Sequence, residues 1–273
     1  GLTLDEIRIA NTPASFEPTL DYIVTKVARF PFDKFSDASN KLGTQMKATG
    51  EVMSIGRTME ESLLKAVRSL ETGVCHIYHK KFDKWSNDDL LAYIKGGTDD
   101  RLYAIGQLIR NGVDLALIYD KTKIDMFFLE KFKNIVEFEN VVRAHPMDVE
   151  TLRAAKRMGF SDKYIGQLWG LSQNEMYRLR EKNNVFPVYK MIDTCASEFA
   201  SYVPYFYSTY EEENESIVSG KEKIIVLGSG PIRIGQGVEF DYSTVHAIWS
   251  IRAAGYEAII INNNPETVST DYT

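Results

Sequence analysis

The sequence predicts a mainly α-helical bundle flanked by β-containing segments, and three observations support this fold class. Residues 58–183 have helical periodicity with short, glycine-marked connections, which favours helices packed on neighbouring helices. Two runs before them, 22–27 and 50–56, have the alternating or apolar character of strands. Residues 222–273 begin a βαβ unit, which indicates an incomplete α/β segment.

The helices are predicted from caps and stop signals. Thr3 and Glu6 have the spacing of a capping box and predict a first helical turn. Thr58 and Glu61 repeat this spacing, and Gly73 is expected to end the helix that they begin. The other helical patterns lie at 88–97 with Ser86 as cap, and at 100–112, 124–143, 148–160, 162–170 and 173–182.

The last third of the chain has a different character. Residues 184–210 are dense in aromatic side chains and are predicted to form an extended chain packed over a surface. Residues 211–221 combine four Glu with Ser and Gly, which is typical of a solvated linker at a domain boundary. Strands are then predicted at 223–227 and 257–261, with a helix at 242–254 between them. Because a lone βαβ unit cannot cover both faces of a parallel sheet, we expect a fragment cut at both ends.

The composition excludes several classes of protein. Of 273 residues, 44% are hydrophobic and 26% are charged, which is typical of a globular chain. The net charge of -6 gives no general attraction to nucleic acid or to anionic membranes. Two cysteines are too few for a disulfide framework, and the sequence has neither an apolar run of roughly 18 residues nor a signal peptide. We therefore expect a cytoplasmic protein with no membrane or nucleic-acid partner.

A glycine-rich loop after the strand at 223–227 is a candidate anion site. Its glycines are Gly228, Gly230, Gly235 and Gly237. The loop matches neither the dinucleotide-binding motif, whose third glycine is replaced by Arg233, nor the P-loop, whose lysine is replaced by Gln236. Backbone amides at the helix start, helped by Arg233, are able to hold an anion. The glycines are equally consistent with close packing alone.

Polar residues follow both predicted strands, at the edge where open α/β sheets bind ligands. These residues are Glu239, Asp241, Asn262, Asn263, Asn264 and Glu266. Helix capping by Asp241 and a turn around Pro265 would account for several of them without a ligand.

Two other patterns carry less weight. Cys75, His76 and His79 lie within five residues but give no complete tetrahedral set, so no metal site is predicted. Residues 161–182 have the outline of a helix-turn-helix. Since the basic excess of residues 150–182 is small, a packed helical pair is favoured over DNA binding.

Four motifs together resemble the large chain of carbamoyl phosphate synthetase. They are GEVMSIGRTMEESLLKA (50–66), PVYKMIDTCASEFASYVPYFYSTYEEE (187–213), VLGSGPIRIGQGVEFDYSTVHA (226–247) and NNNPETVSTDY (262–272), and SFEPTLDY (15–22) also fits. The resemblance touches nearly the whole chain. It implies a helical oligomerisation domain between the end of one ATP-grasp half and the Rossmann-like, pre-ATP-grasp start of the next.

The resemblance also implies boundaries and partners. Residues 1–70 would end the first half, 71–210 would be the oligomerisation domain, 211–221 the linker, and 222–273 the start of the second half. The parent ligase would make carbamoyl phosphate from bicarbonate, two ATP, and ammonia that a glutaminase small subunit releases from glutamine. ATP and Mg²⁺ or Mn²⁺ would serve that parent, and their binding residues lie outside this chain. We therefore expect no bound cofactor, no catalytic residue and no activity of this chain alone, but self-association through its helical domain.

In that family, carbamate travels inside the protein between two phosphorylation sites. The positions that match its carboxylate-lined route are Glu51, Glu239 and Glu266, and burial there would protect a labile carbamate from bulk solvent. Alternatively, these glutamates cap helices or pair with arginines such as Arg57 and Arg233. Two other function classes stay open at this point: a helix-turn-helix DNA-binding regulator and a stand-alone nucleotide-binding module.

Overall fold

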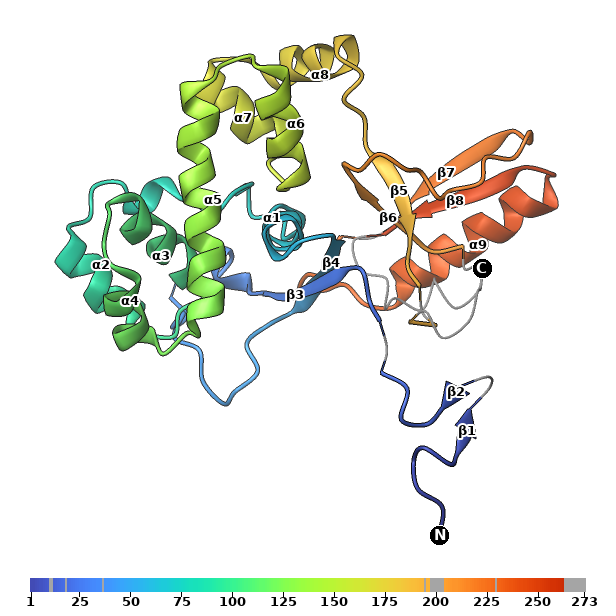
Figure 1. The fold of residues 1–273 in the computed structure, drawn as a ribbon, viewed down its shortest axis with the longest axis horizontal. Helices are drawn as coiled ribbons and strands as arrows, with labels where there is room; N and C mark the ends of the chain where they lie inside the picture. The colour runs from blue at the N-terminus through green and yellow to red at the C-terminus, as the bar shows by residue number, and fades with distance from the viewer. Residues whose placement is uncertain are drawn as a thin grey trace.

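The structure is a computed structural model that describes residues 1–9, 12–17, 19–35, 37–193, 195–196, 204–228 and 230–262. Figure 1 shows a helical body on one side, a strand pair with its helix at the centre, and a smaller α/β unit on the other side. The N-terminal segment extends away from these parts. The helical body and the flanking small sheets agree with the predicted fold class, whereas the assignment of residues 1–70 to an ATP-grasp domain stays a prediction.

The N-terminal segment forms one capped turn that does not continue into a helix. The Glu6 carboxylate accepts hydrogen bonds from the backbone N–H of Thr3 (2.8 Å) and from its hydroxyl (3.0 Å), so the predicted pairing is present. The chain then enters strand β1 (Arg8–Ile9), which pairs antiparallel with β2 (Thr12–Pro13). The predicted helical turn is thus limited to this single turn, and the backbone is extended from Arg8 on.

The central strand pair carries helix α1. Strand β3 (Ile23–Arg29) is antiparallel to β4 (Gly50–Gly56) over all seven residues, and the short 3-10 helix η1 (Pro31–Asp33) follows β3. Helix α1 (Met59–Ser69) begins at Thr58, whose side chain accepts from the N–H of Glu61. The reciprocal half of the predicted capping box is absent, because the Glu61 carboxylate accepts from the N–H of Arg57 (2.8 Å) instead.

The helical body encloses the largest buried apolar cluster of the described residues. Its elements are η2 (Lys80–Phe82), α2 (Asn87–Ile94), α3 (Arg101–Arg110), α4 (Leu115–Thr122), α5 (Met126–Ala144), α6 (Val149–Arg157), α7 (Asp162–Trp169) and α8 (Gln173–Lys182). Side chains such as Phe82, Leu108, Ile135 and Phe160 are fully buried within it. The predicted N-cap residues of α1 and α2 are confirmed. Thr58 accepts from the N–H of Glu61, and the Ser86 hydroxyl accepts from the N–H of Asp89.

Helix α4 was not among the predicted helices. Asp114 caps its start, and its end is at Lys123, which has a left-handed backbone (φ 56°). Helices most often end with Gly in this conformation. A two-turn helix that ends at lysine therefore gave neither a long periodicity nor a recognisable stop signal in the sequence.

A second antiparallel pair leads out of the helical body. Strand β5 (Val188–Met191) pairs with β6 (Phe206–Thr209), in the region that was predicted to be extended. Residues of the predicted linker at 211–221 form hydrogen bonds with the rest of the chain. The side-chain oxygen of Asn214 accepts from the N–H of Tyr189 (2.9 Å), and the N–H of Glu215 donates to the Tyr189 carbonyl (2.9 Å). The acidic segment is thus exposed but is hydrogen bonded along β5.

The α/β unit agrees closely with the sequence. Strands β7 (Lys223–Leu227) and β8 (Glu257–Ile261) have the predicted bounds and are parallel, and helix α9 (Glu239–Ala253) connects them. The helix begins three residues earlier than predicted. Several apolar side chains of the two strands are exposed, among them Leu227 at 79%. Within the described residues, no helix combines the length and apolarity needed to cross a bilayer.

Candidate functional site

Two of the three predicted route carboxylates lie in the described residues. Glu51 is the second residue of β4 and forms an ion pair with Lys26 of β3 (2.9 Å). Glu239 is the first residue of α9, and its carboxylate accepts from the N–H of Gly237 (2.8 Å). Glu266 lies outside the described residues, as do Asn263 and Asn264. Glu239 therefore binds the backbone just before α9 and does not cap the helix, while the ion-pair partner of Glu51 is a lysine and not an arginine.

The glycine-rich loop packs against Gly50, the first residue of β4. A Cβ atom placed on Gly50 would lie 2.6 Å from the carbonyl oxygen of Ile232 and 2.8 Å from its nitrogen. Such distances leave no room for any side chain at position 50. The contact brings the strand residue next to Glu51 against the loop that leads to Glu239, so two route segments that are far apart in sequence meet here.

The polar groups of the loop are engaged by the chain's own acceptors. Arg233 donates to the carboxylate of Glu71, and its backbone N–H donates to the side chain of Gln236 (2.9 Å). A Cβ on Gly230 would lie 2.6 Å from a carboxylate oxygen of Glu71. Gly235 has a left-handed backbone (φ 84°), which favours glycine. The glycines of the loop thus permit close packing, and its arginine binds a carboxylate that the chain itself supplies. Binding of an external anion by the loop stays a prediction.

Gly228 closes the other end of the loop. Its N–H donates to the carbonyl of Ile261 (2.8 Å), the last residue of β8. A Cβ here would collide with the side chain of Asn262. The polar residue after β8 therefore packs on the loop's first glycine, as the rule for the carboxyl ends of parallel strands predicts.

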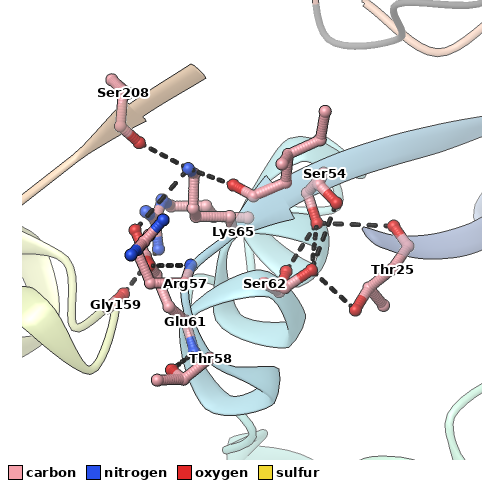
Figure 2. Close-up of polar contacts among 11 residues, drawn as sticks. Thr25, Ser54, Arg57, Thr58, Glu61, Ser62, Lys65, Gly159 and Ser208 are labelled. Carbon is pink, nitrogen blue, oxygen red and sulfur yellow. Dashed lines mark hydrogen bonds and ion pairs between the residues drawn. The ribbon is translucent and has the colours of Figure 1, made fainter. Parts of the chain in front are cut away.

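A polar cluster on α1 joins the central strands to strand β6 and to the helical body (Figure 2). The Lys65 ammonium donates to the carbonyls of Ile55 in β4 (2.5 Å) and Ser208 in β6 (2.6 Å). Burial lowers the pKa of Lys65 to about 8, although Glu61 opposes this shift. Arg68 contacts the helical body, where its guanidinium donates to the carbonyl of Gly159 (2.7 Å), shortly after helix α6.

Close backbone packing explains how α1 reaches these partners. Gly159 has a left-handed backbone (φ 92°), and a Cβ on it would lie 2.8 Å from the Cα of Glu61. On the opposite side of the helix, the Ser62 hydroxyl donates to that of Thr25 (2.7 Å), and the Ser54 hydroxyl donates to the Ser62 carbonyl (2.6 Å). Sequence reasoning did not single out Lys65 or Arg68, because their partners are carbonyl groups, which every residue type has.

A buried charged group lies deeper in the helical body. The Glu139 carboxylate accepts from Arg110 (2.5 and 2.9 Å) and lies 3.0 Å from Nε2 of His76. The ring of His76 stacks on Tyr164 with 3.7 Å between centroids. Burial lowers the pKa of His76 to about 4 despite its acidic neighbour, so the ring is neutral at pH 7.

The histidines near Cys75 form hydrogen bonds within the protein. His76 belongs to the buried group with Glu139, and Nδ1 of His79 accepts from the N–H of Lys81 (3.0 Å) at the start of η2. Within the described ranges, no three His, Cys, Asp or Glu side chains gather in a way that could hold a metal ion.

The helix-turn-helix pattern also has a packing role. Asp162 binds both Lys156 (2.8 Å) and Arg180 (2.8 Å), and these two basic residues are buried. Arg180 also donates to the carbonyl of Val185 (3.1 Å). Because phosphate contacts need accessible cations, the buried pair is not available for DNA. A packed helical unit is therefore the interpretation that the structure favours.

Two family models match this chain. The oligomerisation domain of the carbamoyl-phosphate synthetase large chain matches residues 51–184, and the carbamoyl phosphate synthase preATP-grasp domain matches residues 220–273. The first match includes β4, α1 and the helical body, and the second includes β7, α9 and β8. The two matches confirm the resemblance found in the sequence, whereas the boundaries at 70, 210 and 221 stay predictions.

Proposed function

Because this chain belongs to the carbamoyl phosphate synthetase large-chain family, we propose that it connects the two halves of a glutamine-dependent synthetase and forms part of the carbamate route. The reaction would consume bicarbonate, ammonia from a glutaminase small subunit and two ATP. The family implies a ligase in which the oligomerisation domain mediates self-association. A DNA-binding regulator is not favoured, since Lys156 and Arg180 are buried on Asp162.

The described residues do not fit ATP with Mg²⁺ or Mn²⁺. They contain no group of acidic, histidine or cysteine side chains that could hold the metal. In the glycine-rich loop, the Arg233 side chain and the amides of Arg233 and Gly237 already have partners in the chain. Phosphoryl transfer depends on metal ions and cationic clamps around the phosphates. We therefore derive no phosphorylation step from this chain and expect it to be inactive by itself.

The single observation that best supports the proposed carbamate route is the contact between Gly50 and Ile232. It places the start of β4, where Glu51 lies, next to the loop that leads to Glu239. Such carboxylates would orient carbamate through waters and through its amino group. The expected burial is not found in the described residues, because Glu51 keeps 43% of its side-chain surface exposed and Glu239 is exposed. Cover from bulk water would therefore have to come from other parts of the synthetase. Glu266 would extend the same route beyond the described residues.

The test is Glu239→Gln in the synthetase that carries these residues. A glutamine keeps an acceptor for the N–H of Gly237 and removes only the charge, so the start of α9 should be preserved. We expect more ATP to be hydrolysed for each carbamoyl phosphate formed, because carbamate would escape before the second phosphorylation. Glu181→Gln, at an exposed position on α8, is the matched control. An unchanged ratio of ATP consumed to product formed in Glu239→Gln would reject the route.

A further inference from the structure

The residue after helix α1 has an unusual backbone. Glu71 follows the C-cap residue Leu70 and has φ 56°, in the left-handed region. At the same position after α3, α6 and α9 the chain has glycine, Gly112 (φ 78°), Gly159 (φ 92°) and Gly255 (φ 91°), and after α8 it has Asn184 (φ 53°). Asparagine tolerates this conformation better than most residues. Glycine adopts this conformation without the steric conflict of a Cβ. Since glutamate adopts this conformation only with strain, the contacts of its side chain are of interest.

That side chain reaches the glycine-rich loop. Its carboxylate accepts from the guanidinium of Arg233, which is 162 residues further along the chain. Gly230 lies on the carboxylate as well, since a Cβ there would be 2.6 Å from one oxygen and 3.1 Å from the other. The loop's arginine and one of its glycines thus surround a single carboxylate.

The same loop segment is held from its other side by β4. Ile232 lies between Gly230 and Arg233 in sequence, and its backbone packs on Gly50. The segment therefore has three contacts with β4 and the residue that follows α1: Gly230 and Arg233 contact Glu71, and Ile232 contacts Gly50. Shortly beyond it, Gly237 donates to Glu239 at the start of α9.

We propose that Glu71 is a positioning residue whose carboxylate is the internal anion of the glycine-rich loop and holds that loop against the start of β4. The loop is then a site for a carboxylate that the chain itself supplies, and its position fixes Glu239 relative to Glu51. The effect on coupling rests on the proposed carbamate route, whereas the effect on the loop itself does not.

The test uses Glu71→Gly in the synthetase. Glycine relieves the backbone strain at φ 56° and removes the carboxylate, so a purely structural role in ending α1 would be preserved or improved. We expect amide hydrogen exchange in residues 230–237 to rise about two- to fivefold, the range for loss of a partly exposed ion pair. We also expect the ratio of ATP consumed to carbamoyl phosphate formed to rise, as for Glu239→Gln. Arg233→Lys, which keeps the charge but loses the planar fork, should give a smaller change in both measurements.

The matched control is Glu137→Gln, which breaks an exposed ion pair with Lys133 within α5 and should change neither measurement. Unchanged exchange in residues 230–237 of Glu71→Gly would overturn the positioning role, whatever the coupling ratio. Faster exchange with an unchanged ratio would support the positioning of the loop and would reject the carbamate route that the proposed function assigns to it.

Discussion

The helical body and the glycine-rich loop place carboxylates in opposite environments. In the helical body, Glu139 is 2% exposed and lies between Arg110 and His76, whose ring stacks on Tyr164. At the loop, Glu71 and Arg233 keep 48% and 42% of their side-chain surfaces exposed. Both arrangements pair an acidic group with an arginine, but only the first is withdrawn from water.

Because of this difference, the buried pair should affect the stability of the fold, whereas the exposed pair should affect the position of the loop. Removing one partner of a buried pair leaves a charge without compensation, which costs several kcal/mol. A surface pair contributes about 0–1 kcal/mol, because water screens it and solvates each partner alone. Glu139 should therefore decide whether the helical body folds. Glu71 should instead decide where a loop lies, with little effect on global stability.

The largest effect is expected for Glu139→Gln. The variant leaves the Arg110 guanidinium in the core without its carboxylate, so the free energy of unfolding should fall by about 3–5 kcal/mol. Urea unfolding followed by circular dichroism measures this difference. Glu137→Gln, on the same helix but exposed, should stay within about 0.5 kcal/mol of the unsubstituted protein. A loss of less than about 1 kcal/mol in Glu139→Gln would remove the contrast between the two regions.

A smaller effect is expected from the titration of His76. Its pKa is about 4 in the folded protein because of burial, against about 6.5 in an unfolded chain. The unfolded state therefore binds more protons between these values, so stability should fall as the pH falls from about 6.5 to about 4. The loss should be on the order of 3 kcal/mol.

Urea unfolding at pH 7.5 and at pH 5 tests this dependence. Glu139 does not titrate in this window, because hydrogen bonds from Arg110 and His76 outweigh burial and lower its pKa to about 2. A His76→Gln variant keeps a donor for Glu139 and does not titrate, so it should lose less stability between the two pH values. An equal loss in both proteins would assign the pH dependence to other groups.

The sequence could predict features whose signal is local, but not contacts between distant residues. The bounds of β7 and β8 followed from two apolar runs, because the signal for a strand lies within its own residues. The glycine-rich loop was found for the same reason. Its internal ligand was not found, because Glu71 lies 162 residues from Arg233 and only the folded backbone brings them together. Lys65 was missed because its partners are the carbonyls of Ile55 and Ser208, which carry no signal in the side-chain pattern.

The smallest effect concerns the contact between β4 and the glycine-rich loop and uses Gly50→Ala. The new methyl group would meet the Ile232 backbone at 2.6 Å, so the loop or the strand has to shift, at a cost of about 1–3 kcal/mol. Gly43→Ala is the matched control, because a Cβ there has no neighbour within 4 Å. Urea unfolding should separate the two variants, and amide exchange should locate the change of Gly50→Ala in residues 230–237. If Gly50→Ala is as stable as Gly43→Ala and exchanges like the unsubstituted protein, the loop does not rest on β4 and the contact that carries the route is absent.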